Sequence, residues 1–305
     1  TDSSVDAGTG AGLNALELGL EGVGGTDIEF TVTDTAGAVA SELSATGDEL
    51  NAANDVNVVG GTIDVAAADA VQDITAYDSG ASDYDIQDSA GALLSSVGQE
   101  AVVNSGVDTV FVTDSSVDAG TGAGLNALEL ELEGVGGTDI EFTVTDTAGA
   151  VASELSATGD ELDEANDVNV VGGTIDVAAA DAVQDITAYD AVDSDYDIED
   201  DASTLLSTTG VDAVVDSGVD QVFVTDSSVD ADTGAGLNAL ELSLQDVGGT
   251  DIEFTVTDTA GAVASELSAT GDELDEANDV NVVGGTIDVA AADAVQDITA
   301  YDAVD

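Results

Sequence analysis

The chain has no Lys, Arg, His, Pro, Cys, Met or Trp among its 305 residues, so every charged side chain is acidic. Without basic side chains it cannot neutralise phosphate, and we expect it to bind neither nucleic acid nor an anionic membrane surface. The missing residues also exclude a Ser-His-Asp triad, a thiolate nucleophile, a Schiff-base amine and a soft-metal site. Carboxylate chemistry remains, and hard cations are the expected partners.

Acidic and small apolar residues dominate what is present. The sequence contains 66 Asp and Glu residues, giving a formal net charge of -66, and 43% of its residues are apolar. High charge with 3% aromatic residues is typical of a disordered chain. The apolar fraction favours a folded chain whose carboxylates are screened by cations, because two like charges about 5 Å apart in water repel by roughly 0.8 kcal/mol.

The sequence repeats with a period of 112 residues. The string TDSSVDA begins at Thr1, Thr113 and Thr225. We therefore expect one continuous array with repeat 1 at residues 1–112, repeat 2 at 113–224 and a partial repeat 3 at 225–305. Because the chain begins inside a repeat and stops within a loop, we expect it to be part of a longer polymer or polyprotein. Three differences between copies change acidity, and we expect these positions to be exposed: Gly8 becomes Asp232, and Ala52 becomes Glu164 and Glu276.

A shorter period lies within each repeat. Apolar residues stand four and two positions before Asp34, Asp88 and Asp114, and Gly60 replaces the Asp in a fourth segment of the same pattern. Spacings of 26, 28, 26 and 32 residues predict four coils of about 28 residues. The predicted core consists of Phe30, Val32, Val56, Val58, Tyr84, Ile86, Val110 and Val112.

The apolar period becomes helical after each of these strands. The predicted helical stripes are Ala36, Val39, Ala40 and Leu43; Ala90, Leu93, Leu94 and Val97; and Ile63, Ala66, Ala67 and Ala70. In the coil after Asp114, Leu128, Leu130 and Leu132 alternate with acids. That pattern leaves a second strand and the end of a helix both open.

A strand followed by a short helix in every coil predicts an α/β fold. We favour a right-handed β/α solenoid, in which a parallel sheet forms one wall and short helices form the other. The alternative is a string of 112-residue all-β sandwich domains. The sandwich accounts less well for the helical stripes.

Two rows of aspartates are candidate cation ligands. The row before the strands comprises Asp27, Asp55, Asp83, Asp108 and Asp139, and stacking of coils would bring its members about 4.8 Å apart, where neighbouring carboxylates can share Ca²⁺. The row after the strands comprises Asp34, Asp88 and Asp114, of which Asp34 and Asp88 are also predicted helix N-caps. Turn capping is the alternative role for any single Asp.

The densest acidic segment, DAVDSDYDIEDD, adds Asp193, Asp195 and Asp197 as candidate ligands, with a solvated loop as the alternative. It does not match the EF-hand loop, and the calcium-binding nonapeptide GGxGxD is absent. Paired carboxylates can hydrolyse glycosides. Here the acids recur in every copy and no Trp is present to stack on a sugar, so we expect no enzymatic activity. The glycine-rich segments lack the Lys of a phosphate loop and are predicted turns.

The sequence pattern VTDTAGAVASEL, followed by YDIQDSAGALLSSV, resembles the tandem repeats of very large acidic bacterial surface and secreted proteins of the calcium-binding RTX-like type. The resemblance implies an extracellular or cell-surface location and a calcium-stabilised structural or adhesive role. We therefore expect a structural protein of an extracellular filament, sheath or surface layer that assembles with copies of itself. The alternatives are the stalk of a large calcium-dependent adhesin and, ranked last, an ice- or mineral-binding surface. We expect no membrane insertion by this part of the chain.

Overall fold

The computed structural model describes residues 4–23, 28–46, 50–158, 162–216, 218–270 and 274–302. The chain forms two compact units, Thr1–Val144 with Glu161–Asn166, and Thr145–Asp160 with Asp167–Asp305. Both contain parallel β-sheets and α-helices, so the fold is α/β, as predicted, and the all-β sandwich is wrong.

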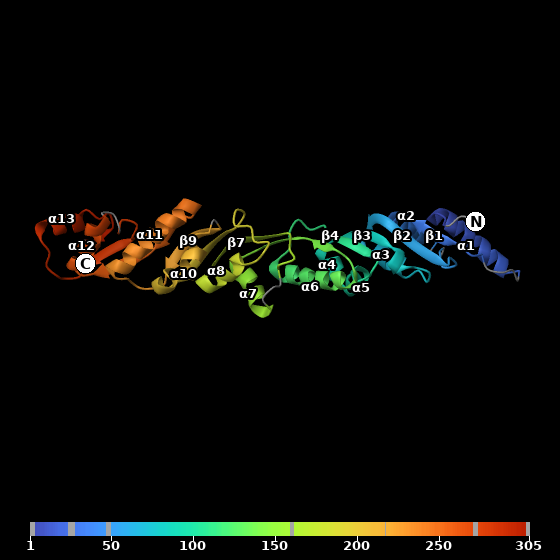
Figure 1. Ribbon diagram of the computed structural model, residues 1–305, viewed down its shortest axis with the longest axis horizontal. Helices are drawn as coiled ribbons and strands as arrows, with labels where there is room; N and C mark the ends of the chain where they lie inside the picture. Colours follow the sequence, from blue (N-terminus) through green and yellow to red (C-terminus); the bar gives the residue numbers. More distant parts are fainter. Residues whose placement is uncertain are drawn as a thin grey trace. The chain divides into compact units, whose positions relative to one another are not determined.

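The first unit alternates strands with helices (Figure 1). Its elements are α1 (Ala7–Glu21), β1 (Thr31–Asp34), α2 (Ala36–Thr46), β2 (Asp55–Ile63), α3 (Val65–Gln72), β3 (Asp83–Asp88), α4 (Ala90–Leu93), α5 (Ser96–Val102), β4 (Val107–Val112), α6 (Ala119–Val135) and β5 (Asp139–Glu141). The sheet has the order β1-β2-β3-β4-β5, with parallel neighbours throughout. Neighbouring helices also contact one another in chain order, so each strand-helix segment packs on the next.

The second unit repeats this order in two sheets. Its elements are β6 (Thr143–Asp146), which spans the boundary, α7 (Ala148–Thr158), β7 (Asp167–Ile175), α8 (Val177–Gln184), β8 (Asp195–Asp200), α9 (Ala202–Leu205), α10 (Thr208–Val214), β9 (Val219–Val224), α11 (Ala231–Val247), β10 (Asp251–Glu253), β11 (Thr255–Asp258), α12 (Ala260–Thr270), β12 (Asp279–Val282), α13 (Val289–Gln296) and β13 (Tyr301–Asp302). The sheet orders are β10-β9-β8-β7-β6 and β11-β12-β13. Buried Phe254 alone separates β10 from β11.

The core lies on one face of the sheet, but its register differs from the prediction. Val32 pairs with Val56, and Ile86 with Val110, each two residues from the expected partner. A shift of two keeps each side chain on the same face of its strand. The predicted core residues Val32, Val56, Val58, Tyr84, Ile86 and Val110 are therefore buried. Phe30, just before β1, and Val112, the last residue of β4, are only half-buried.

Two glycines form a bulge in the second coil, where the pairing of β2 with β3 differs by five residues from the prediction, which placed Val58 opposite Ile86. Gly60 and Gly61 have φ angles of +71° and +91°, a backbone conformation that glycine adopts at little cost. The strand bulges there and continues to Ile63, which pairs with Ile86. The predicted helical stripe beginning at Ile63 is therefore wrong. The buried residues of α3 are Val65, Ala68 and Val71, whereas Ala66 and Ala70 are exposed and Ala67 is half-buried.

The helices differ from the predicted stripes in two other coils. Ser95 caps α5 and separates it from α4, so Ala90 and Leu93 are buried while Val97 is exposed. The undecided segment is wholly helical, because α6 runs to Val135 with Leu125, Leu128 and Leu132 buried and Leu130 exposed. The stripe on α2 is confirmed in its buried part, Ala36 and Val39, whereas Ala40 and Leu43 are half-buried.

Candidate functional site

The aspartates after the strands connect each strand to a helix that precedes it. In β3, Asp88 accepts a hydrogen bond from Ser89 N–H through Oδ1 (2.7 Å) and one from Val65 N–H through Oδ2 (3.2 Å). Val65 is the first residue of α3, whose N-terminal amides have no partner within the helix. The same contact to a first helical amide is made by Asp34, Asp114, Asp200, Asp226 and Asp258. We call these six residues the bridging aspartates.

This arrangement corrects the predicted capping role of Asp34 and Asp88. The N-cap of α4 is Ser89, and α2 begins at Ala36, two residues beyond Asp34. Each bridging aspartate binds a helix that precedes its strand in the chain, α4 for Asp114 and α9 for Asp226, instead of capping the helix after its strand. Sequence spacing could not reveal this contact, because donor and acceptor lie 23 to 27 residues apart in the chain.

A second set of aspartates supplies N-caps that the sequence analysis did not single out. The caps whose carboxylates accept from the third helical residue are Asp6, Asp64, Asp118, Asp176, Asp201, Asp230 and Asp288. At α3, for example, Asp64 accepts from Ala67 N–H (2.8 Å) while Asp88 accepts from Val65 N–H. Two carboxylates thus lie at the positive end of one helix dipole, an arrangement that stabilises the helix.

Hydrogen bonding lowers the pKa of several of these caps. The backbone N–H of Thr9 is the largest cause at Asp6, and Thr121 N–H is the largest at Asp118. A carboxyl whose pKa is lower in the folded state adds stability above its ordinary pKa and loses that contribution as the pH falls. Ionised caps are therefore part of what keeps the helices in place.

Two aspartates of the row before the strands do come together. Asp83 and Asp108 line a hollow of about 120 Å³ with Ser82, Gly106 and Gly136. A hollow of about 150 Å³ at the equivalent place in the second unit is lined by Asp195, Asp220, Ser194, Gly218 and Gly248. We call these the aspartate hollows. Backbone carbonyls and water can complete a Ca²⁺ shell around a carboxylate pair.

Asp197 does not line the hollow of the second unit, but it interacts with two acids that do. Partial burial raises the pKa of Asp197, and the negative charges of Asp220 and Asp195 raise it further. The predicted ligands Asp195 and Asp197 therefore lie in one electrostatic group with Asp220. Asp193 is exposed, and its N–H donates to Asp190 Oδ1 at 3.4 Å.

The other members of the row do not stack as a ladder. Asp55 pairs with Thr31 in the sheet, Asp83 with Val59 and Asp139 with Thr109, so no two of these aspartates are direct partners. Asp27 lies outside the described residues. In the part of the chain that the structure describes, no three acidic residues are placed to hold one metal ion.

Three buried glutamates at equivalent positions were missed by the sequence analysis. Glu17 in α1, Glu129 in α6 and Glu241 in α11 are 7%, 2% and 1% exposed, and the Oε2 atom of each has no hydrogen-bond partner. Burial is the main cause that raises the pKa of Glu129 and of Glu241 to about 8, and neighbouring acids raise it further. The acids beside Glu129 are Asp139 and Glu164. Glu164 was predicted to be exposed and is half-buried, as is Ala52 in the first copy, whereas Gly8 and Asp232 are exposed as expected.

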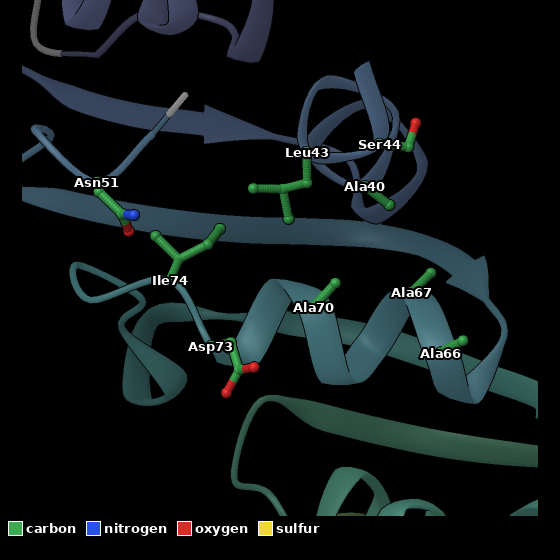
Figure 2. A pocket seen from close by; sticks show the side chains of 9 residues that line it. All are labelled: Ala40, Leu43, Ser44, Asn51, Ala66, Ala67, Ala70, Asp73 and Ile74. Carbon is green, nitrogen blue, oxygen red and sulfur yellow. The ribbon is translucent and has the colours of Figure 1, made fainter. Parts of the chain in front are cut away.

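A separate groove of about 460 Å³ lies between α2 and α3 (Figure 2). It is lined by Ala40, Leu43, Ser44, Asn51, Ala66, Ala67, Ala70, Asp73 and Ile74. The three alanines of α3 that belong to the predicted helical stripe line this groove (Figure 2). Four alanines, Leu43 and Ile74 make most of its lining apolar, and Asp73 contributes a carboxylate.

No protein-family model matches the sequence, and no protein of curated function matches it. None of the helices in the described segments is both long and apolar enough to cross a lipid bilayer. Carboxylates recur at this site in two structural roles. One set bridges or caps helices, and the other lines the aspartate hollows.

Proposed function

We propose that the chain is a β/α solenoid with four coils per 112-residue repeat, and that it is a structural module without enzymatic activity. Consecutive parallel strands and the matching row of helices support this architecture, since each coil packs on the next in chain order. The bridging aspartates are the observation that carries the proposal. They place the same hydrogen bond between successive coils in both units, so the repeated residues maintain the stack.

The module functions in an extracellular filament, sheath or surface layer, with copies of itself as partners and calcium as the stabilising ion. A net charge of -66 with no cationic side chain makes the folded state dependent on dissolved cations. The aspartate hollows are the sites at which calcium binds, because two aspartates line the hollow in each unit and backbone carbonyls and water can complete the calcium shell. The hollow recurs at equivalent positions in both units. This recurrence favours a structural array over a protein with one unique binding site.

Calcium is expected to stabilise the full chain more than sodium does at equal ionic strength. A ligand that binds only the folded state adds about 2.7 kcal/mol per site when its concentration is 100 times Kd. The test is urea unfolding followed by circular dichroism, first with chelator at low salt and then with CaCl₂ or NaCl. Identical midpoints in the two salts would show that diffuse screening, and not site binding, stabilises the protein.

Matched variants assign the calcium effect to the hollows. The variant Asp83→Asn, Asp108→Asn, Asp195→Asn and Asp220→Asn removes four carboxylates from them. The control, Glu21→Gln, Glu100→Gln, Asp212→Asn and Asp246→Asn, removes four exposed ones elsewhere. We expect the first variant to lose the difference between calcium and sodium, and the control to keep it. A difference retained in the first variant would place the calcium sites elsewhere.

A further inference from the structure

Glu241 is a buried carboxyl in a chain that has no cationic side chain to pair with it. It lies in α11 with 1% of its surface exposed. Its Oε1 accepts a hydrogen bond from Gln245 Nε2 (3.1 Å), whereas Oε2 has no partner. The nearest acidic neighbours are Asp251 in β10 and Glu276 in the turn before β12. The unpartnered oxygen is therefore buried beside further negative charge.

An ionised carboxylate in this position carries a large energetic penalty, because it loses its hydration without gaining a counter-charge. A side-chain cation cannot relieve it, since the sequence has none. A metal ion held by three acids does not fit either, because no three acidic residues in the described segments are placed to bind one. A proton on the carboxyl removes the charge and turns the unpartnered oxygen into a donor.

We propose that Glu241 is a proton-binding site, a neutral carboxylic acid whose Oε2–H donates to the carboxylate of Asp251. As the pH rises, the proton leaves to solvent and Glu241 becomes anionic beside the carboxylate of Asp251. Burial of Glu241 and the charges of Asp251 and Glu276 all raise its pKa, while the backbone N–H of Ile252 opposes the shift. Glu129 in the first unit has the same burial and the same unpartnered Oε2, so the geometry recurs one repeat earlier.

The other acidic groups on elements packed against α11 are hydrogen-bonded elsewhere, exposed or half-buried. Asp258, at the end of β11, accepts from Ala231 N–H and Thr259 N–H at the start of a helix, and Glu253 of β10 accepts from Gln221. Asp212 of α10 is exposed, and Glu266 of α12 is half-buried. Asp251 and Glu276 are the two acids whose charges act on Glu241.

The site makes folding sensitive to pH in the neutral range. The folded pKa of about 8 lies above the ordinary value of 4.5, so the folded state binds more protons between these values. The stabilising contribution is complete below the ordinary pKa and is lost as the pH rises through 8. Each pH unit in this interval lowers the folding equilibrium constant by up to about tenfold per site.

Titration of the full chain, labelled with ¹³C at the glutamate carboxyls, tests the assignment by NMR. The sequence has no side chain whose ordinary pKa lies between about 6 and 9, so a carboxyl signal that titrates there reports a displaced glutamate. With chelator present we expect two such signals, from Glu129 and Glu241. The variant Glu241→Gln should remove one of them, while the control Asp246→Asn, an exposed change on the same helix, should leave both.

The variant Glu276→Ala, which copies Ala52 of the first repeat, should move the remaining midpoint of Glu241 to lower pH by removing one like charge. If Glu241→Gln does not fold, the titration of the unaltered protein together with Glu276→Ala still decides the matter. Glutamate signals that all titrate below pH 6 overturn the proposal, as does a signal that becomes anionic at pH 7 only when calcium is added. Neither result depends on whether calcium binds the aspartate hollows.

Discussion

Replacing Gly98 with alanine is expected to destabilise the first unit by about 3 kcal/mol. Gly98 is buried in the first turn of α5, and its missing side chain lets the helix lie directly against the end of α4. A Cβ at this position would overlap the backbone carbonyls of Ala92 and Leu93. Backbone atoms cannot rotate aside as a flexible side chain can, so the two helices must separate. Urea unfolding should show a lower midpoint with little change in slope.

The control for this prediction is Gly91→Ala in α4. No atom lies within 4 Å of a Cβ added at Gly91, and its backbone is already helical. Alanine should stabilise the protein by about 0.5–1 kcal/mol there, because it reduces the entropy of the unfolded chain. The equivalent of Gly98 in the second unit, Gly210, should respond as Gly98 does, since its Cβ would overlap the carbonyls of Thr204 and Leu205. Equal effects at Gly91 and Gly98 would contradict the close approach of α4 and α5.

The alternation of strands and helices could be predicted from the sequence because apolar periodicity is a local property. Val32, Val56 and Ile86 were placed on the buried face without knowledge of their partners. Register is not local: Ile86 pairs with Ile63, five residues beyond the expected partner Val58, and the bulge at Gly60 and Gly61 lies within that pairing. Because β2 continues to Ile63, α3 begins later than the apolar pattern indicated, and its alanines line the groove.

The candidate site was predictable in composition but not in contacts. The sequence indicated that rows of aspartates are candidate cation ligands, and Asp83 and Asp108 of one row do share a hollow. The partner of Asp88 was not predictable, because the donor, the amide of Val65, lies 23 residues away and a backbone amide has no sequence signature. Glu129 stood in a pattern of alternating leucines and acids that is equally typical of a strand. Only the long helix α6 places that glutamate in the interior.

Removing one bridging aspartate is expected to cost about 1.5–3 kcal/mol, the usual contribution of a hydrogen bond to a charged group. In Asp88→Ala, the amides of Val65 and Ser89 lose their acceptor, and the N-terminus of α3 loses a favourable negative charge. Asp88→Asn retains an acceptor oxygen and should have an intermediate effect. The matched control is Asp73→Asn at the exposed C-terminal cap of the same helix. There a negative charge opposes the dipole, so its removal should stabilise the protein slightly.

The response to calcium separates bridging from metal binding at Asp88. Both Asp88→Ala and Asp73→Asn remove one negative charge. If repulsion among the carboxylates were the only effect, both variants would be more stable than the unaltered protein. A metal ligand at Asp88 predicts that the loss of stability appears with calcium and vanishes in chelator. A bridge between coils predicts the same loss in both conditions, because the amides of Val65 and Ser89 need their acceptor whether or not calcium is bound. Unfolding of the three proteins in chelator and in CaCl₂ measures this difference, and a loss confined to calcium would return Asp88 to the set of metal ligands.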